Sequence, residues 1–185
     1  MPIALKGYKL MKYELRELPY NREKAVEYAH TWAYFRNPNF YNFDEIGGDC
    51  TNFASQCIYA GSNVMNYTPT FGWYYININE RAPAWTGVQY LYNFLTTNSG
   101  AGPYGREVPI EEVQAGDLVQ LLFAGEVFSH SPVIVSIDGE TPSFYNISVA
   151  AHSSDCDCRP ISSYAFKQMR FIHIEGVRYP HAVDD

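Results

Sequence analysis

The chain has 185 residues, of which 46% are hydrophobic and 18% are charged, a composition typical of a globular protein with a substantial core. Its 20 acidic and 13 basic residues give a net charge of −7, which argues against nucleic acid or an anionic membrane as partner, because both bind clustered lysine and arginine. No apolar run approaches the roughly 18 residues of a membrane-spanning helix. Four cysteines in a chain of this length do not form a disulfide framework, and no break suggests two domains, so we expect a single domain over residues 1–185.

The first 20 residues form a weakly patterned N-terminal extension. Residues 8–18 fit either a strand or a frayed helix. Charged and apolar residues alternate throughout the extension, which lacks the apolar core of a signal peptide. The sequence therefore predicts a protein that is cytoplasmic as synthesised, or one that is released by a route other than the usual secretory one.

A first helix is expected to begin after Asn21, whose side chain can cap it, and to end at Asn37 and Pro38. Its apolar stripe consists of Ala25, Val26, Ala29, Trp32 and Ala33. The aromatic loop that follows, residues 37–46, leads to a pair of glycines. This loop can bring Tyr41 to the border of the next helix.

The second helix is predicted to start at Cys50, because apolar residues recur from there at helical spacing. They are Cys50, Phe53, Ala54, Cys57 and Ile58. Asp49 is the expected N-cap and Gly61 the expected left-handed stop. At the first helical position the helix dipole and free N–H groups favour a thiolate, so Cys50 is a candidate nucleophile. The alternative is a buried structural cysteine.

The rest of the chain changes from helical to strand patterns. A third helix is expected from Pro83 to Thr97, with a buried stripe of Trp85, Val88, Leu91, Tyr92 and Leu95. Four short branched or aromatic runs then predict strands at residues 117–123, 131–137, 144–151 and 169–174. Helices followed by an antiparallel meander give the α+β class.

A cysteine nucleophile needs a base, and histidine suits that role at neutral pH. His130 immediately precedes the strand 131–137, and His152 follows the strand that returns through the turn at 138–140. If these strands form a hairpin, His130 comes level with residues 150–153 and the two histidines meet at one end of the sheet. The alternative is that both are structural or surface residues. The other histidines are interpreted as structural or incidental: His30, His173 and His181.

Several local motifs resemble the bacterial putative amidase domain family, over about residues 21–175. They are the segments 25–29, 49–57, 115–120, 130–135 and 152–155, together with Trp85. The family is related to the NlpC-like and CHAP cell-wall hydrolases among the papain-like cysteine peptidases. The resemblance implies a papain-like fold, with N-terminal helices packed on a C-terminal antiparallel β-sheet that is partly barrel-like.

Carried onto this sequence, the resemblance makes Cys50 the nucleophile and His130 the base. The third, orienting position falls on His152, with Asp155 as the alternative. Papain has a glutamine six residues before its cysteine for the oxyanion hole, but Asp44 stands there in this chain and its ionised carboxylate cannot donate. The backbone N–H of Cys50 is the expected donor, with Tyr41 as a second.

The sequence thus predicts a cysteine amidase or peptidase that cleaves amide bonds of peptidoglycan-derived peptides through an acyl-enzyme, without a cofactor or metal. An acyltransferase would use the same thiol and imidazole. A non-catalytic metal- or peptide-binding module is a further alternative, built from His152, Asp155, Cys156 and Cys158, although the Cys-x-Cys spacing is tighter than that of structural zinc loops. The oligomeric state is not readable from the sequence.

Overall fold

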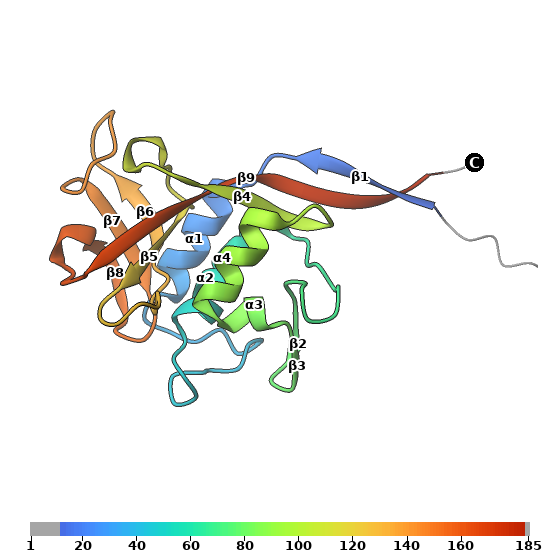
Figure 1. Ribbon diagram of the computed structural model, residues 1–185, viewed down its shortest axis with the longest axis horizontal. Coiled ribbons are helices and arrows are strands. Elements are labelled where there is room, and N and C mark those ends of the chain that lie inside the picture. Colours follow the sequence, from blue (N-terminus) through green and yellow to red (C-terminus); the bar gives the residue numbers. More distant parts are fainter. Residues whose placement is uncertain (1–11, 184–185) are drawn as a thin grey trace, which may run out of the picture.

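The computed structural model describes residues 12–183, so the first 11 positions of the predicted N-terminal extension lie outside the described residues. Within residues 12–183 the chain places its four helices ahead of most of its strands (Figure 1). The helices are α1 (Arg22–Trp32), α2 (Cys50–Ser62), α3 (Pro83–Thr86) and α4 (Val88–Thr97), with 3₁₀ turns η1 (Ile110–Glu112) and η2 (Ile161–Ser163). The strands are β1 (Lys12–Leu18), β2 (Tyr75–Asn77), β3 (Glu80–Arg81), β4 (Gly102–Val108), β5 (Leu118–Leu122), β6 (Val133–Ile137), β7 (Ile147–Ala151), β8 (Cys156–Pro160) and β9 (Gln168–Val183).

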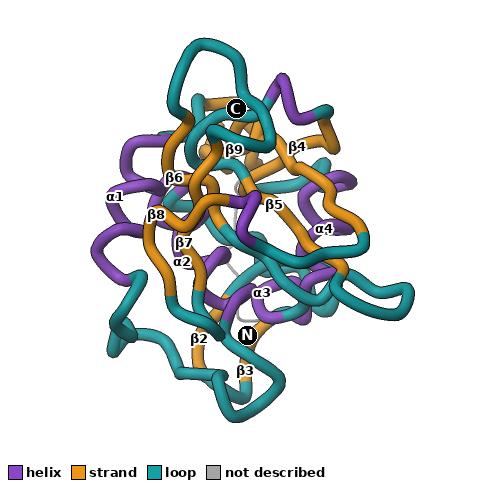
Figure 2. The backbone as a smooth tube through the Cα atoms, turned by 90° about the vertical axis from the view of Figure 1, so that its left-hand side faces the viewer, coloured by secondary structure: helices purple, strands orange, loops and turns teal. Residues whose placement is uncertain are grey.

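Seven strands form one antiparallel sheet with the order β1-β9-β5-β6-β7-β8, and β4 also pairs with β9. The long β9 crosses the whole molecule, and its far end forms a two-stranded ribbon with β1 that projects beyond the helices (Figure 1). A tube view from the side shows α1 and α4 on either side of the strands β5 and β6 (Figure 2). The α+β class is thus confirmed. Within residues 12–183 the strand path does not close on itself, so the expected partial barrel is not observed.

Each face of the central strands carries its own hydrophobic cluster. Leu118, Val133 and Val135 join the helices in the first cluster. Their strand neighbours Val119 and Ile134 join the second cluster, which η1, η2 and Tyr164 cover on the opposite face. Successive side chains of a strand point to opposite faces, so a sheet buried on both sides needs apolar residues at every position. This explains why β5 and β6 are apolar except at Gln120 and Ser136.

The predicted starts of the first two helices are confirmed, whereas two predicted caps are wrong. Asn21 caps α1 by accepting a hydrogen bond from the Lys24 N–H, and α2 begins at Cys50. Asp49, however, makes no side-chain capping bond to the helix. The left-handed residue that ends α2 is Asn63, with φ 53°, not Gly61. Gly61 is needed inside the helix for another reason: a Cβ there would lie 2.7 Å from the Asn21 carbonyl oxygen.

The later elements were predicted less completely. The third helix is divided in two at Gly87, whose extended backbone (φ −112°, ψ 124°) separates α3 from α4. The four expected strands are present as β5, β6, β7 and β9, but β9 has 16 residues. Strands β4 and β8 were not predicted. None of the helices in residues 12–183 is both long and apolar enough to cross a bilayer.

Candidate active site

Cys50 lies at the start of α2, where the helix meets the segment that leads into β6. Its side chain is 7% exposed. The sulfur lies 3.9 Å from the carbonyl oxygen of Ser129 and 3.8 Å from Thr51 Oγ1. Thr51 in turn donates to Ser131 Oγ at 3.4 Å. The helix start is therefore packed against residues 129–131, which carry His130.

Burial works against the predicted thiolate. Desolvation raises the pKa of the Cys50 thiol above its usual value, and the negative charge of Asp49 adds to this. Hydrogen bonds from the backbone of Ser131 and from Thr51 oppose the shift without reversing it. The expectation of a depressed pKa is wrong for this structure, because the loss of water around the sulfur outweighs the hydrogen bonds that favour the thiolate. Cys50 is a neutral thiol at neutral pH.

Asp49 is the most heavily bonded side chain beside the cysteine. It is fully buried, and its Oδ1 accepts from the Phe43 N–H at 2.8 Å and from Asn52 Nδ2 at 2.9 Å. Its Oδ2 lies 2.6 Å from His152 Nδ1. The Asp49 N–H donates to Ser153 Oγ at 2.7 Å. Asp49 therefore joins the loop before α2, the helix itself and the end of β7.

His152 is engaged at both ring nitrogens. Nδ1 meets Asp49, and Nε2 lies 2.8 Å from the carbonyl oxygen of Trp32 at the end of α1. The ring also stacks on Phe53 with 4.0 Å between centroids. Because a carbonyl oxygen only accepts, Nε2 must carry a hydrogen, and Nδ1 is occupied by the carboxylate. In this arrangement His152 has no free nitrogen to take a proton from a thiol, and it contacts Asp49 rather than His130.

His130 has a different environment. The isolated bridge between Leu121 and His130 places the two residues opposite each other, on the sheet face of the second cluster. Its ring lies beside Phe123 and Tyr164, and it lines a pocket of 250 Å³ with Ser153, Ser154 and Arg159. No residue in 12–183 forms a hydrogen bond with the ring. Cys50 and His130 thus belong to adjoining segments, but no hydrogen bond joins their side chains.

Burial lowers the pKa of His130 to about 4, and the nearby charge of Arg159 contributes to the shift. The unfolded chain binds a proton at this site below the ordinary value of 6.5, whereas the folded protein remains neutral there until about pH 4. The free energy of unfolding should therefore fall as the pH falls from 6.5 towards 4, by about 3 kcal/mol from this group. Urea unfolding at a series of pH values measures this loss.

The matched variant for that measurement is His130→Gln, which keeps a polar side chain but cannot titrate. The free energy of unfolding of the wild type minus that of the variant should decrease as the pH falls from 6.5 to 4. The titration of carboxylates affects both proteins equally and therefore cancels in this difference. Parallel pH curves would show that the histidine is not held neutral by the fold.

The remaining predicted site residues are held by other partners. Asp155 forms two hydrogen bonds with Arg36, at 2.8 and 2.9 Å, and Arg36 also binds Asp44 at 2.7 Å. The backbone N–H of Tyr41 donates to the Tyr75 hydroxyl, and its carbonyl accepts from Asn52. Among the described residues, neither Asp155 nor Tyr41 forms a hydrogen bond with Cys50 or His130. The roles of Asp155 as the alternative third member and of Tyr41 as the second oxyanion donor therefore stay predictions.

The proposed four-residue metal set is also dispersed. His152 is engaged as described above, and Asp155 binds Arg36. Cys156 lies 3.5 Å from the Tyr164 hydroxyl, while the exposed Cys158 lies beside Asp157. The four side chains of this set are therefore held by different partners.

Polar residues inside α2 have a structural role that was not predicted from the sequence. Three of them are buried and bonded: Asn52 Oδ1 accepts from Trp85 Nε1 at 2.9 Å, Ser55 from Trp73 Nε1 at 3.0 Å, and Gln56 from the Tyr28 hydroxyl at 2.7 Å. The signal was the run of polar residues within an otherwise apolar helix, which needs buried partners. These bonds fix the helix that begins at Cys50.

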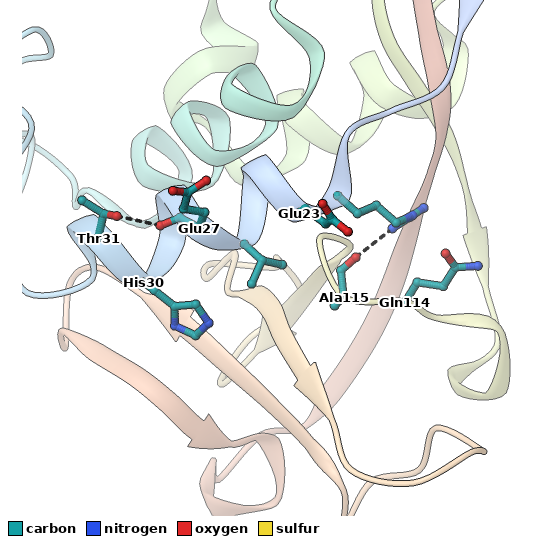
Figure 3. A pocket seen from close by; sticks show the side chains of 8 residues that line it. Glu23, Glu27, His30, Thr31, Gln114 and Ala115 are labelled. Atoms are coloured by element: carbon teal, nitrogen blue, oxygen red, sulfur yellow. Dashed lines mark hydrogen bonds between the residues drawn. The ribbon is translucent and has the colours of Figure 1, made fainter.

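A pocket of 690 Å³, larger than the one beside His130, lies elsewhere. It runs along α1 from Glu23 to His30 and is closed on one side by Gln114 and Ala115 (Figure 3). Its lining includes neither Cys50 nor His130. The volume of a pocket therefore does not identify the position of the candidate catalytic residues in this protein.

Comparison with known proteins shows the family to which the chain belongs. Residues 19–174 match the family model described as "Putative amidase domain". The chain belongs to this family. It is also 31% identical over 126 residues to the uncharacterized protein YhbB of Bacillus subtilis (strain 168), an alignment that covers 66% of this chain and 39% of YhbB.

Membership of the putative amidase domain family suggests amide hydrolysis for the matched region. The aligned part of the chain spans about two fifths of the length of YhbB. No solved structure matches the chain, so the papain-like fold remains a prediction from the resemblance.

Proposed function

We propose that this amidase-family protein is a cysteine hydrolase that cleaves amide bonds in peptides, with Cys50 as nucleophile and His130 as general base. The observation that carries the proposal is the packing of Cys50, the first residue of α2, against the segment 129–131 that contains His130. His130 has no hydrogen-bond partner in residues 12–183, so its ring nitrogens are unoccupied, although burial makes the imidazole a weaker base than a free histidine. His152 is not available as the base, because both of its ring nitrogens are engaged.

The reaction proceeds by acyl transfer to sulfur. His130 takes the thiol proton as Cys50 Sγ attacks the amide carbonyl carbon, and backbone N–H groups at the start of α2 stabilise the oxyanion. The C–N bond then breaks as His130 returns the proton to the leaving amine. Water, deprotonated by His130, attacks the thioester and releases the carboxylic acid and the free thiol.

For this reaction the side chains of Cys50 and His130 must come within hydrogen-bonding distance of each other. The His130 ring, now between Phe123 and Tyr164, turns towards the sulfur when substrate binds, since catalytic hydrogen bonds commonly tighten only in the complex. Neutral thiol and neutral imidazole fit a base that removes the proton during attack rather than a preformed ion pair. We assign His152 a positioning role, because its Nδ1 binds Asp49, the residue that directly precedes the nucleophile Cys50.

The proposed substrate is a peptide amide of peptidoglycan, in keeping with the resemblance to cell-wall hydrolases. Purified peptidoglycan and soluble muropeptides should be incubated with wild-type protein and with Cys50→Ala, and the new amines and carboxylates identified by mass spectrometry. Products are expected with wild type alone. Release of the same products by Cys50→Ala would overturn the assignment of the nucleophile.

A second experiment tests the nucleophile without a substrate. Mild alkylation at neutral pH is expected to modify Cys50 faster than Cys57, which lies on the same helix and is completely buried. His130→Ala should slow the modification of Cys50. Equal rates for the two cysteines would contradict an accessible nucleophile.

A further inference from the structure

Three potential metal ligands from distant parts of the chain converge beside the end of α1. They are His30 in the last turn of α1 and Asp157 and Cys158 in β8. His30 Nδ1 lies 2.8 Å from Asp157 Oδ1 and 3.0 Å from Oδ2. Cys158 Sγ lies 3.6 Å from Asp157 Oδ1. All three ligand atoms lie within 4.8 Å of one another. In Figure 3 the His30 ring points away from α1, at one end of the large pocket.

The backbone of β8 makes this convergence possible. Successive side chains of a regular strand point to opposite faces, which would separate Asp157 from Cys158. Cys158 instead has φ 55°, a left-handed conformation that is uncommon for a residue other than glycine. The alternation is interrupted there, so that the thiol lies beside the neighbouring carboxylate. A simple His30–Asp157 ion pair would not need the thiol.

The donor set suits zinc. An imidazole nitrogen, a carboxylate oxygen and a thiolate sulfur are the three ligand types that zinc takes in proteins, at about 2.0 to 2.3 Å. In a tetrahedron of that size the ligands are about 3.3 to 3.8 Å apart, so closing the observed arrangement needs movements on the order of 1 Å. The partly exposed His30 and exposed Cys158 can make such movements. With three protein ligands, the fourth position is open to water.

We propose that His30, Asp157 and Cys158 form a surface binding site for zinc(II). The bound ion joins the end of α1 to β8, two segments separated by more than 120 positions in the chain. Because the carbonyl of Trp32, two residues after His30, bonds to His152, the ion also anchors the part of α1 that contacts the Asp49–His152 pair. The site is separate from the proposed chemistry of Cys50.

Cobalt(II) and zinc(II) are the probes for this site. Protein stripped with a chelator and kept reduced should bind one cobalt per chain and show a thiolate-to-cobalt charge-transfer band, which zinc abolishes by displacement. Zinc should also raise the melting temperature of the stripped protein. Cys158→Ser and His30→Ala are each expected to weaken cobalt binding at least about tenfold and to remove the zinc-dependent stabilisation.

The matched control is Cys156→Ser, which removes a thiol two residues away that contacts Tyr164 instead. It should keep the cobalt band, as should Cys50→Ser, which serves as control if the buried Cys156 cannot be replaced without unfolding. Circular dichroism checks that each variant is folded. A band that survives in Cys158→Ser, a band that is lost in Cys50→Ser, or no binding by folded wild type would each overturn the proposal.

Discussion

Cys50→Ala, His130→Ala and the double variant are expected to lose amide hydrolysis to the same floor, each by about 10³-fold or more. The reason is that the two side chains act on one proton, so that removing either disables the same step. The double variant should therefore be no slower than the single ones. Initial rates of product formation on the best peptide substrate, with equal amounts of folded protein, measure the effect.

The control is Cys57→Ala, a thiol on the same face of α2 that lies in the first hydrophobic cluster. It should keep its activity per folded molecule, although it loses some stability. Multiplicative losses in the double variant would contradict a joint role, because independent contributions add as free energies. Full activity in His130→Ala would show that His130 is not the general base.

Asp49→Ala is expected to lower the free energy of unfolding by about 3 to 5 kcal/mol, the cost of breaking a buried ion pair on one side. The substitution leaves three buried donors without their acceptor: the Phe43 N–H, Asn52 Nδ2 and His152 Nδ1. Unsatisfied buried donors are costly because water cannot replace the lost partner. Urea unfolding at pH 7 gives the measurement.

Asp49→Asn is the informative comparison. Its amide oxygen can still accept from the Phe43 N–H and from Asn52, and its NH₂ group can donate to a neutral His152. We therefore expect this variant to retain most of the stability that alanine loses. If the two substitutions are equally destabilising, the carboxylate charge matters more than its hydrogen bonds. A loss below about 1 kcal/mol for Asp49→Ala would contradict the described network.

Local patterns predicted the parts of the fold that local forces determine. The Asn21 cap and the start of α2 at Cys50 depend on residues a few positions apart, and the hairpin of β6 and β7 joins strands that follow each other in the chain; all are confirmed. The full length of β9 was missed because its second half pairs with β1, and its exposed residues carry no strong apolar signal. Strand β8 was missed because its polar sequence, ending in Pro160, resembles a loop.

The candidate site was predictable in its position but not in its bonding. The sequence placed Cys50 at a helix start, and the structure adds that the start packs on the segment before β6. Asp49 was assigned to capping because that rule considers only neighbouring residues. Its actual partner, His152, lies 103 positions away, and only the completed sheet brings the two together. For the same reason, the convergence of His30 with Cys158 could not be predicted from spacing.

The arrangement of β9 has a consequence for how quickly the protein folds. This one strand pairs with β1, β4 and β5, and its contact between Lys12 and Val183 joins positions 171 apart (183 − 12). Closing such large loops costs entropy before any contact stabilises them, and folds with many distant pairings typically cross their barrier in milliseconds to seconds. Refolding should be limited by the docking of β9, so that substitutions in its central pairing slow the refolding rate.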